Sequence, residues 1–369
     1  MTLFDALYVI DGVPQEDTPR YLLTGELALD RTDFPELQDE TVDPHLNAWT
    51  YRESEIPSHL EKMAAYPYPF SLRYPASSAR LSLASALADT LWLEGRFSYD
   101  QLRLRLEWLW NDKELGALAA FYQTCEALGE YVESLRLEID GLSHRPGALC
   151  ELIPQFVIPQ MAGAPNPPVR KIPAHLLPQE NSWILYLPLD PCGFALGGSL
   201  LSKVCGNAGD GPVEVGDGDY LMDVYEIVRE MVEDGIVLSG VTVARGGLMT
   251  ALTRWSGPCL DGAHFSPEAP GTGMDLDIAS LMKAYDLSEM DEIDRARALF
   301  GEVPAVLLQI RDEDYDYVDA QCLLQDVAYY ALGHPSSLEN ESDGAASRIH
   351  ISHNPVPVLS SLLQALISR

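Results

Sequence analysis

The feature that most constrains the fold is the run LRLRLEWLW at residues 102–110, where apolar and charged side chains alternate. Successive side chains of a β-strand point to opposite faces, so a two-residue period gathers the apolar ones on a single face. That face would carry four leucine or tryptophan side chains and a fifth at the end of the run: Leu102, Leu104, Leu106, Trp108 and Trp110. The opposite face carries Arg103, Arg105 and Glu107. The pattern predicts a half-buried strand in a sheet that is packed on one side.

Segments with the helical period lie on both sides of this strand. Residues 76–93 place leucine at every fourth position, and Ser77 or Ser78 could supply the N-cap. Residues 115–135 carry a second apolar stripe at helical spacing. We expect both helices to pack on the apolar face of the same sheet.

Strand and helix patterns continue to alternate along the rest of the chain. Expected strands lie at Ala6–Ile10, 183–189, 236–244 and 305–310, and expected helices lie at 219–234, after Gly246-Gly247, and at 359–368. This alternation is typical of a mixed α/β fold, of the α+β kind.

The length of 369 residues is too great for one compact core and favours two domains. Seven prolines fall between residues 154 and 178, which indicates a loop-rich crossing between domains. We therefore divide the chain into four parts: a divergent segment 1–70, an N-terminal domain 71–150, the crossing 151–182, and a C-terminal domain 183–369.

The formal charge of -32 limits the classes of partner that the chain can have. Such a surface repels phosphate backbones and anionic membranes, so we expect neither nucleic acid nor membrane among its partners. No stretch reaches the roughly 18 to 20 apolar residues that a membrane span needs. The first residues are acidic, unlike a signal peptide, and the six cysteines are scattered without metal-binding spacing. We expect a cytoplasmic protein in a reducing compartment.

Six short blocks occur in an order that resembles the second synthetase half of phosphoribosylformylglycinamidine (FGAM) synthase. They are SALADTL at 85–91, LEWLW at 106–110, EIDGLS at 138–143, LGGSLLSKV at 196–204, VTVARGGL at 241–248 and ALFGE at 298–302. The family patterns are E-A-L-T-N-L, N-W-M-W, G-K-D-S-L-S, L-G-G-S-A-L-A-Q-V, H-D-x-S-D-G-G-L and L-F-x-E. The resemblance implies a two-domain fold of the AIR-synthase-related kind. It does not cover residues 1–70.

The departures from these patterns fall on polar positions. Ser85 and Asp89 stand where the family has Glu and Asn, and Thr242 and Arg245 stand where it has two Asp. The Lys before Asp140 in the third block has become Ile139. Magnesium needs several oxygen ligands, and isolated carboxylates make a poor site. The resemblance therefore implies that ATP or ADP and magnesium are not held, and that no catalytic residue is present.

Eight residues remain as candidate remnants of a nucleotide site: Asp89, Asp140, Ser143, Gly197, Gly198, Ser199, Gly246 and Gly247. A Gly-Gly turn at a helix start could present N–H groups to an anion, but it could equally be a tight structural turn. Asp89 and Asp140 could share a cation, or each could be a solvated or hydrogen-bonded carboxylate. The acidic run DEDYDYVD at 312–319 could dock a basic partner, although a solvated helix start is the simpler interpretation.

Three hypotheses remain. The first is a non-catalytic FGAM-synthase-like protein that acts by binding another protein, as a second copy in a homodimer or as a different chain in a heterodimer. Relatives of this kind occur among large DNA viruses as tegument proteins, which would place the protein in a host cell or virion. The second is a subunit of a split FGAM synthase, which would need a separate catalytic half. The third is an unrelated acidic α/β binding protein.

Overall fold

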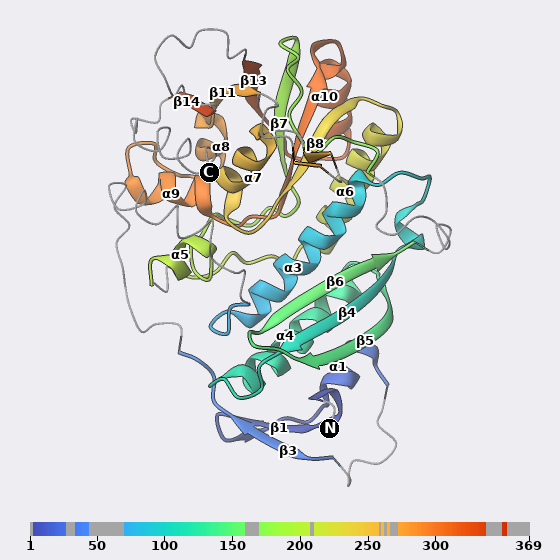
Figure 1. Cartoon of the computed structure of the whole chain (residues 1–369), viewed down its shortest axis with the longest axis vertical. Coiled ribbons are helices and arrows are strands. Elements are labelled where there is room, and N and C mark those ends of the chain that lie inside the picture. The colour runs from blue at the N-terminus through green and yellow to red at the C-terminus, as the bar shows by residue number, and fades with distance from the viewer. Residues whose placement is uncertain are drawn as a thin grey trace.

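A computed structural model describes residues 3–26, 34–43, 70–158, 170–206, 210–257, 260–261, 264–265, 272–336 and 349–352 (Figure 1). Helices and strands alternate through these residues, so the expected mixed α/β class is confirmed. The predicted helix at 359–368 lies outside them. No helix in the described part of the chain is long and apolar enough to cross a membrane.

A three-stranded sheet is built around the alternating run. Strand β4 (Arg103–Trp110) pairs in parallel with β5 (Glu138–Pro146) and antiparallel with β6 (Glu151–Val157). The apolar face of β4 is buried as expected, with Trp108 and Trp110 fully enclosed. Strand β6 comes from the segment expected to cross between domains. The division into domains remains a prediction.

Two helices pack on the apolar side of this sheet. They are α3 (Pro75–Asp89), which ends in the short 3₁₀ turn η3 (Thr90–Trp92), and α4 (Ala117–Ser134). The predicted N-cap is wrong. Helix α3 begins at Pro75, whose fixed φ and missing N–H suit the first helical position, and Tyr74 before it makes no side-chain cap. Ser77 lies inside the helix and donates its hydroxyl to the carbonyl of Val213.

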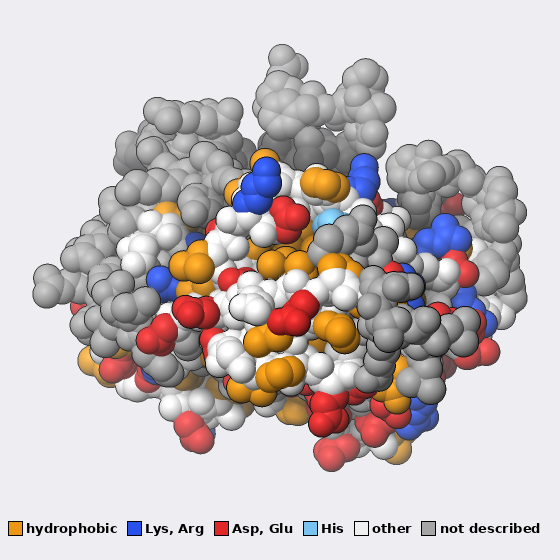
Figure 2. All heavy atoms as spheres, turned by 90° about the horizontal axis from the view of Figure 1, so that it is seen from below, with side chains coloured by type: hydrophobic (Ala, Val, Ile, Leu, Met, Phe, Trp, Pro, Cys, Tyr) orange, Lys and Arg blue, Asp and Glu red, His pale blue; other side chains and the backbone are white. Residues whose placement is uncertain are grey.

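A small unit from the N-terminal segment docks on α4. It comprises η1 (Leu3–Asp5), β1 (Leu7–Ile10), β2 (Val13–Pro14), α1 (Pro19–Thr24) and β3 (Glu36–Asp39), and β1 confirms the strand predicted at Ala6–Ile10. The Asp39 carboxylate accepts from the backbone N–H of Leu118 at 2.9 Å and of Ala119 at 3.1 Å. It thereby caps α4, whose own preceding residue is a glycine without a side chain. Seen from this end, apolar side chains gather at the centre of the described surface with carboxylates scattered around them (Figure 2).

The C-terminal half is organised on a six-stranded sheet of order β14-β11-β13-β7-β12-β8. Its strands are β7 (Ser182–Pro188), β8 (Val237–Val243), β11 (Gly273–Asp277), β12 (Ala305–Arg311), β13 (Tyr330–Ser336) and β14 (Ile349–Ser352). The helices of this half are α5 (Leu200–Val204), α6 (Gly218–Glu233), α7 (Gly247–Ser256), α8 (Ala279–Ala284), α9 (Glu292–Phe300) and α10 (Tyr315–Leu324). The short elements of this half are η6 (Asp312–Asp314), β9 (Leu260–Asp261) and β10 (His264–Phe265). One further short element, η4 (Tyr99–Gln101), precedes β4 of the small sheet.

Helix α3 lies between the two sheets and determines where the candidate site forms (Figure 1). It contacts β6 of the small sheet and also β8 and β12 of the large one. Its C-terminal end is held by Arg229 of α6, whose guanidinium donates to the carbonyls of Leu91 and Leu93 at 3.0 and 2.9 Å, and to that of Gly95. A buried cation thus binds carbonyls of η3 and of the turn that follows it.

Candidate functional site

Two blocks that are far apart in sequence meet where α3 ends beside β8. The Thr242 hydroxyl of β8 donates to the Asp89 carboxylate at 2.7 Å. The Trp92 indole N–H, one turn beyond α3, donates to the same hydroxyl oxygen at 3.0 Å. Asp89 and Thr242 therefore lie together, as the resemblance implies, but they are bonded to each other.

The guanidinium of Arg170 lies near this contact. Arg170 donates to the carbonyl of Gly240 at 2.9 Å and lies over the Trp92 ring, 5.7 Å from its centre. Burial raises the pKa of Asp89, while its bond to Thr242 and the charge of Arg170 act in the opposite direction. The Asp89 residue keeps an exposed surface, however, so solvent also favours its charged form.

A second arginine stands where the family pattern has a carboxylate. The guanidinium of Arg245 approaches the Ser82 hydroxyl of α3 at 3.4 Å. Ser85, where the family has Glu, donates its hydroxyl back to the carbonyl of Leu81 within the same helix. The residues at this site therefore supply one carboxylate, hydroxyl groups and nearby guanidinium groups. Such a set does not fit magnesium, which needs several oxygen ligands and is repelled by positive charge.

The first glycine turn leads into α5, whose N-cap is Ser199. Two of its backbone N–H groups are bonded within the protein. Gly197 N–H donates to the carbonyl of Gly211 at 2.6 Å, and Ser199 N–H donates to that of Leu196 at 3.1 Å. Gly198 adopts a φ of +73°, and a Cβ there would lie 2.9 Å from the Tyr74 ring. The glycines are thus explained by backbone shape and close packing.

Both glycine turns converge on one buried carboxylate. The same oxygen of Glu302 accepts from the N–H of Leu200 at 2.7 Å and from the N–H of Gly246 at 2.8 Å. Leu200 is the first residue of α5, and Gly246 precedes α7. A carboxylate thus occupies the position at two helix starts where an external anion could otherwise bind.

Gly247 is fixed by the same packing. Its N–H donates to the carbonyl of Ala244 at 3.0 Å, and a Cβ there would lie 2.7 Å from the backbone carbon of Phe300. The remaining space at the first glycine turn is about 20 Å³ and is lined by Ser199 and Glu302 among others. That is room for about one water molecule, so a phosphate group does not fit.

Lys203, in α5, belongs to the same cluster. Burial and, to a lesser degree, charge repulsion by Arg245 lower its pKa to about 7, although Glu302 acts in the opposite direction. The family pattern has Gln where this chain has Lys203. This difference places a second basic side chain next to Arg245.

Asp140 and Ser143 lie elsewhere. Both are in β5, and the Asp140 carboxylate accepts from the guanidinium of Arg105 at 2.7 Å. Arg105 alternates with side chains such as Trp108, whose ring contacts Phe121 of α4 at 5.7 Å, so it lies on the face turned away from the helices. The structure therefore does not bring Asp140 to Asp89 and Thr242. Among the described residues, no group of three or more His, Cys, Asp or Glu side chains could hold a metal.

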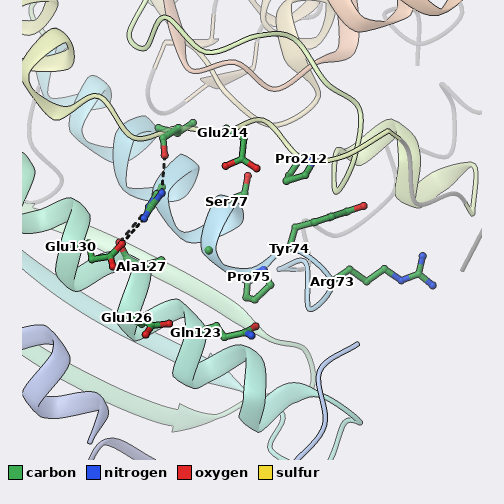
Figure 3. A pocket seen from close by; sticks show the side chains of 13 residues that line it. Arg73, Tyr74, Pro75, Ser77, Gln123, Glu126, Ala127, Glu130, Pro212 and Glu214 are labelled. Atoms are coloured by element: carbon green, nitrogen blue, oxygen red, sulfur yellow. Dashed lines mark hydrogen bonds and ion pairs between the residues drawn. The ribbon is translucent and has the colours of Figure 1, made fainter. Parts of the chain in front are cut away.

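A larger pocket of about 360 Å³ opens beside the first glycine turn (Figure 3). It lies between the start of α3, the middle of α4 and residues 212–215. Arg80 is bound to Glu130 at 2.8 Å, and Glu126 on α4 and Glu214 on the opposite loop also line the pocket. Partial burial and the neighbouring Glu130 raise the pKa of Glu126. Three glutamates outnumber the two arginines at its walls, so the pocket does not favour a polyphosphate.

The chain was compared with family models, curated proteins and solved structures. No family model matches. The chain is 25% identical to human phosphoribosylformylglycinamidine synthase over 253 residues, which is 66% of this chain and 17% of that enzyme. It is also 25% identical to the probable chloroplastic/mitochondrial enzyme of Arabidopsis thaliana over 347 residues, which is 90% of this chain and 23% of that protein. The chain is thus similar in sequence to a part of these FGAM synthases.

Solved structures with a similar course of the chain include Thermotoga maritima PurL complexed with ATP. It has a TM-score of 0.47 and 14% identity, and the match covers 84% of this chain and 42% of that one. The hydrogenase maturation protein HypE has a TM-score of 0.44 and 12% identity over 74% of this chain and 79% of that one. The FGAM-synthase-like chain spans about a fifth of the length of the curated relatives that it matches.

Three residues of this site were not predicted as such. Arg170 lies in the Pro-rich segment, where no periodicity marks it. Glu302 belongs to the block ALFGE and was therefore visible, but its two donors come from residues 102 and 56 positions away. Lys203 could have been found as a charged replacement inside an otherwise matching block.

Proposed function

We propose that this FGAM-synthase-like chain is non-catalytic, holds neither a nucleotide nor magnesium at the α3–β8 site, and acts by binding another protein. The main support is the set of side chains at this site, which supplies one carboxylate, hydroxyl groups and guanidinium groups where magnesium needs several oxygen ligands. The pairing of Asp89 with Thr242 and the approach of Arg245 to Ser82 support the same conclusion.

The outer face of the small sheet is the surface that we propose for this contact. Three ion pairs join β4 to β5 across it: Arg103 with Glu138, Arg105 with Asp140, and Arg145 with Glu107. Positive and negative charges are equal in this set, whereas the whole chain carries -32. A second copy, or another acidic FGAM-synthase half, could approach here with less repulsion than elsewhere. Because the centre of this face is charged, the interface would be more polar than a typical homodimer interface.

Sedimentation of the protein at micromolar concentration tests the proposed surface. Reversing Arg105 and Arg145 together to Glu leaves four carboxylates unpaired on each face and should weaken self-association by about tenfold or more. The matched control is Arg136→Glu, which reverses an equally exposed arginine that is paired with Asp219 away from this sheet. A monomeric wild type, with no acidic synthase half captured, would refute this part of the proposal.

An activity assay separates the two functional hypotheses. We expect the isolated chain to produce no FGAM from its formyl precursor, ATP and ammonia. The split-enzyme alternative rests on the similarity to FGAM synthases, of which the matches cover 17% to 23%. Turnover that appears only when a catalytic half is added would establish that alternative. Turnover by this chain alone would refute both.

A further inference from the structure

Helix α10 presents apolar side chains on two opposite sides. Its inner side is packed: Val318 and Cys322 are fully buried, and the ring of Tyr315 lies 5.1 Å from that of Trp183. A surface helix normally needs only one such apolar side. The outer side of α10 therefore requires a separate explanation.

The outer side carries a concentration of exposed apolar residues. Leu323 is 78% exposed, Leu324 is 79% exposed and Tyr317 is 38% exposed. Only four other large apolar residues in the described part of the chain are exposed, and they lie on other elements: Val13, Leu115, Leu149 and Met290. Tyr317, Ala320 and Leu324 follow the i, i+3, i+7 spacing, so they form one stripe along the helix. Clustered exposed apolar groups mark interaction surfaces, whereas single ones are ordinary.

Carboxylates surround this stripe. Asp312 and Glu313 precede the helix, and Asp316 lies in its first turn; all three are exposed. Two more carboxylates, Glu230 of α6 and Asp234 at its C-terminal end, act on Tyr317. Loss of solvent and these two charges raise the pKa of Tyr317. In contrast, the basic residue that begins this region, Arg311, is paired with Asp314 at 3.1 Å. The surface thus combines an apolar centre with an acidic rim.

We propose that the exposed side of α10 docks a basic amphipathic helix of another protein. This side, called the α10 stripe, comprises Tyr317, Ala320 and Leu324 together with Leu323, which lies beside Ala320. Such a helix would place its apolar side on the stripe and its lysines or arginines against the acidic rim. Charge complementarity selects this occupant over a second copy of the chain, because a second copy would bring another acidic surface. The proposal is independent of the proposed contact at the small sheet, which involves none of these residues.

The inner anchoring makes the stripe a preformed surface. The Tyr329 hydroxyl donates to the Asp319 carboxylate at 2.7 Å and so ties α10 to the residues just before β13. A helix fixed on one side loses little conformational freedom when a partner binds to the other, which favours affinity.

The test measures binding of a fluorescent peptide to the whole chain. The probe is a leucine–lysine peptide of about 18 residues with all leucines on one helical side, long enough to form a helix on binding. We expect binding that weakens about tenfold or more in the double variant Leu323→Ser/Leu324→Ser. The control is Met290→Ser, which removes an apolar side chain that is 90% exposed on another part of the surface. Substitutions at such exposed positions should leave the fold intact.

Two control peptides test the recognition chemistry. A peptide with glutamate in place of lysine should not bind, and one with the same residues in scrambled order should bind more weakly. Equal binding of the first probe to the wild type and to the double variant would overturn the proposal, because it would show general attraction to an acidic surface. Loss of self-association in the double variant would also overturn it, since a second copy would then be the occupant.

Discussion

Replacing Glu302 should show how strongly the two glycine turns depend on an internal carboxylate. Glu302 is 5% exposed, and one of its oxygens accepts from the N–H groups of Leu200 and Gly246. Glu302→Ala removes the acceptor and leaves two donors without it at the starts of α5 and α7. A hydrogen bond to a charged group contributes about 1.5 to 3 kcal/mol, so we expect a loss of about 3 to 5 kcal/mol.

Glu302→Gln is the matched variant, because its amide oxygen can occupy the same position and accept from both donors. It loses only the negative charge at two helix starts, and we expect a loss of about 1 kcal/mol. Urea unfolding gives both values, provided that the slope against denaturant is unchanged. The reasoning would be refuted if the alanine variant lost less than about 1 kcal/mol, or if both variants lost the same amount.

Three further predictions concern stability. Arg229→Met should cost about 3 to 5 kcal/mol in urea unfolding, because it removes the cation that binds three carbonyls at the end of α3, and Arg229→Lys should recover part of that loss. Gly129→Ala should lower the free energy of unfolding by about 1 to 3 kcal/mol, since the added Cβ would lie 2.0 Å from the carbonyl oxygen of Leu22. Helix propensity alone would raise it by about 1 kcal/mol, so a more stable variant would disprove the close approach. Lys203 has a folded-state pKa of about 7, below its unfolded value, so between about pH 7 and 10 the folded state loses its proton first and stability should rise with pH. Lys203→Gln should flatten this rise, and an unchanged pH profile of the free energy of unfolding would contradict the prediction.

Local periodicity was sufficient to predict the elements that position the site. The alternating run became β4 with its tryptophans buried, and the two leucine-rich segments became α3 and α4. Two of the six blocks do meet in the fold, since the contact at 2.7 Å joins Asp89 of the first block to Thr242 of the fifth.

The contacts that decide the character of the site were beyond the reach of sequence patterns. Asp39 caps α4 across 79 residues, and Glu302 joins two turns that are themselves far apart. Neither contact leaves a local period, because the donors are backbone N–H groups that every residue except proline carries. The sequence left open whether Asp89 and Asp140 share a cation or are separate carboxylates. The alternation that defines β4 was clear, but the side of the sheet to which β5 would turn Asp140 depended on its register.

Calorimetric titration of the purified chain with Mg-ADP tests the central claim most directly. We expect no heat of binding up to about 1 mM ligand, and no change in melting temperature in a parallel experiment. A site with a dissociation constant of about 10 µM would stabilise the native state by about 2.7 kcal/mol at that concentration, which shifts the melting temperature by several degrees. Such a shift, accompanied by saturable heat, would show that the α3–β8 site holds a nucleotide and would contradict the proposal.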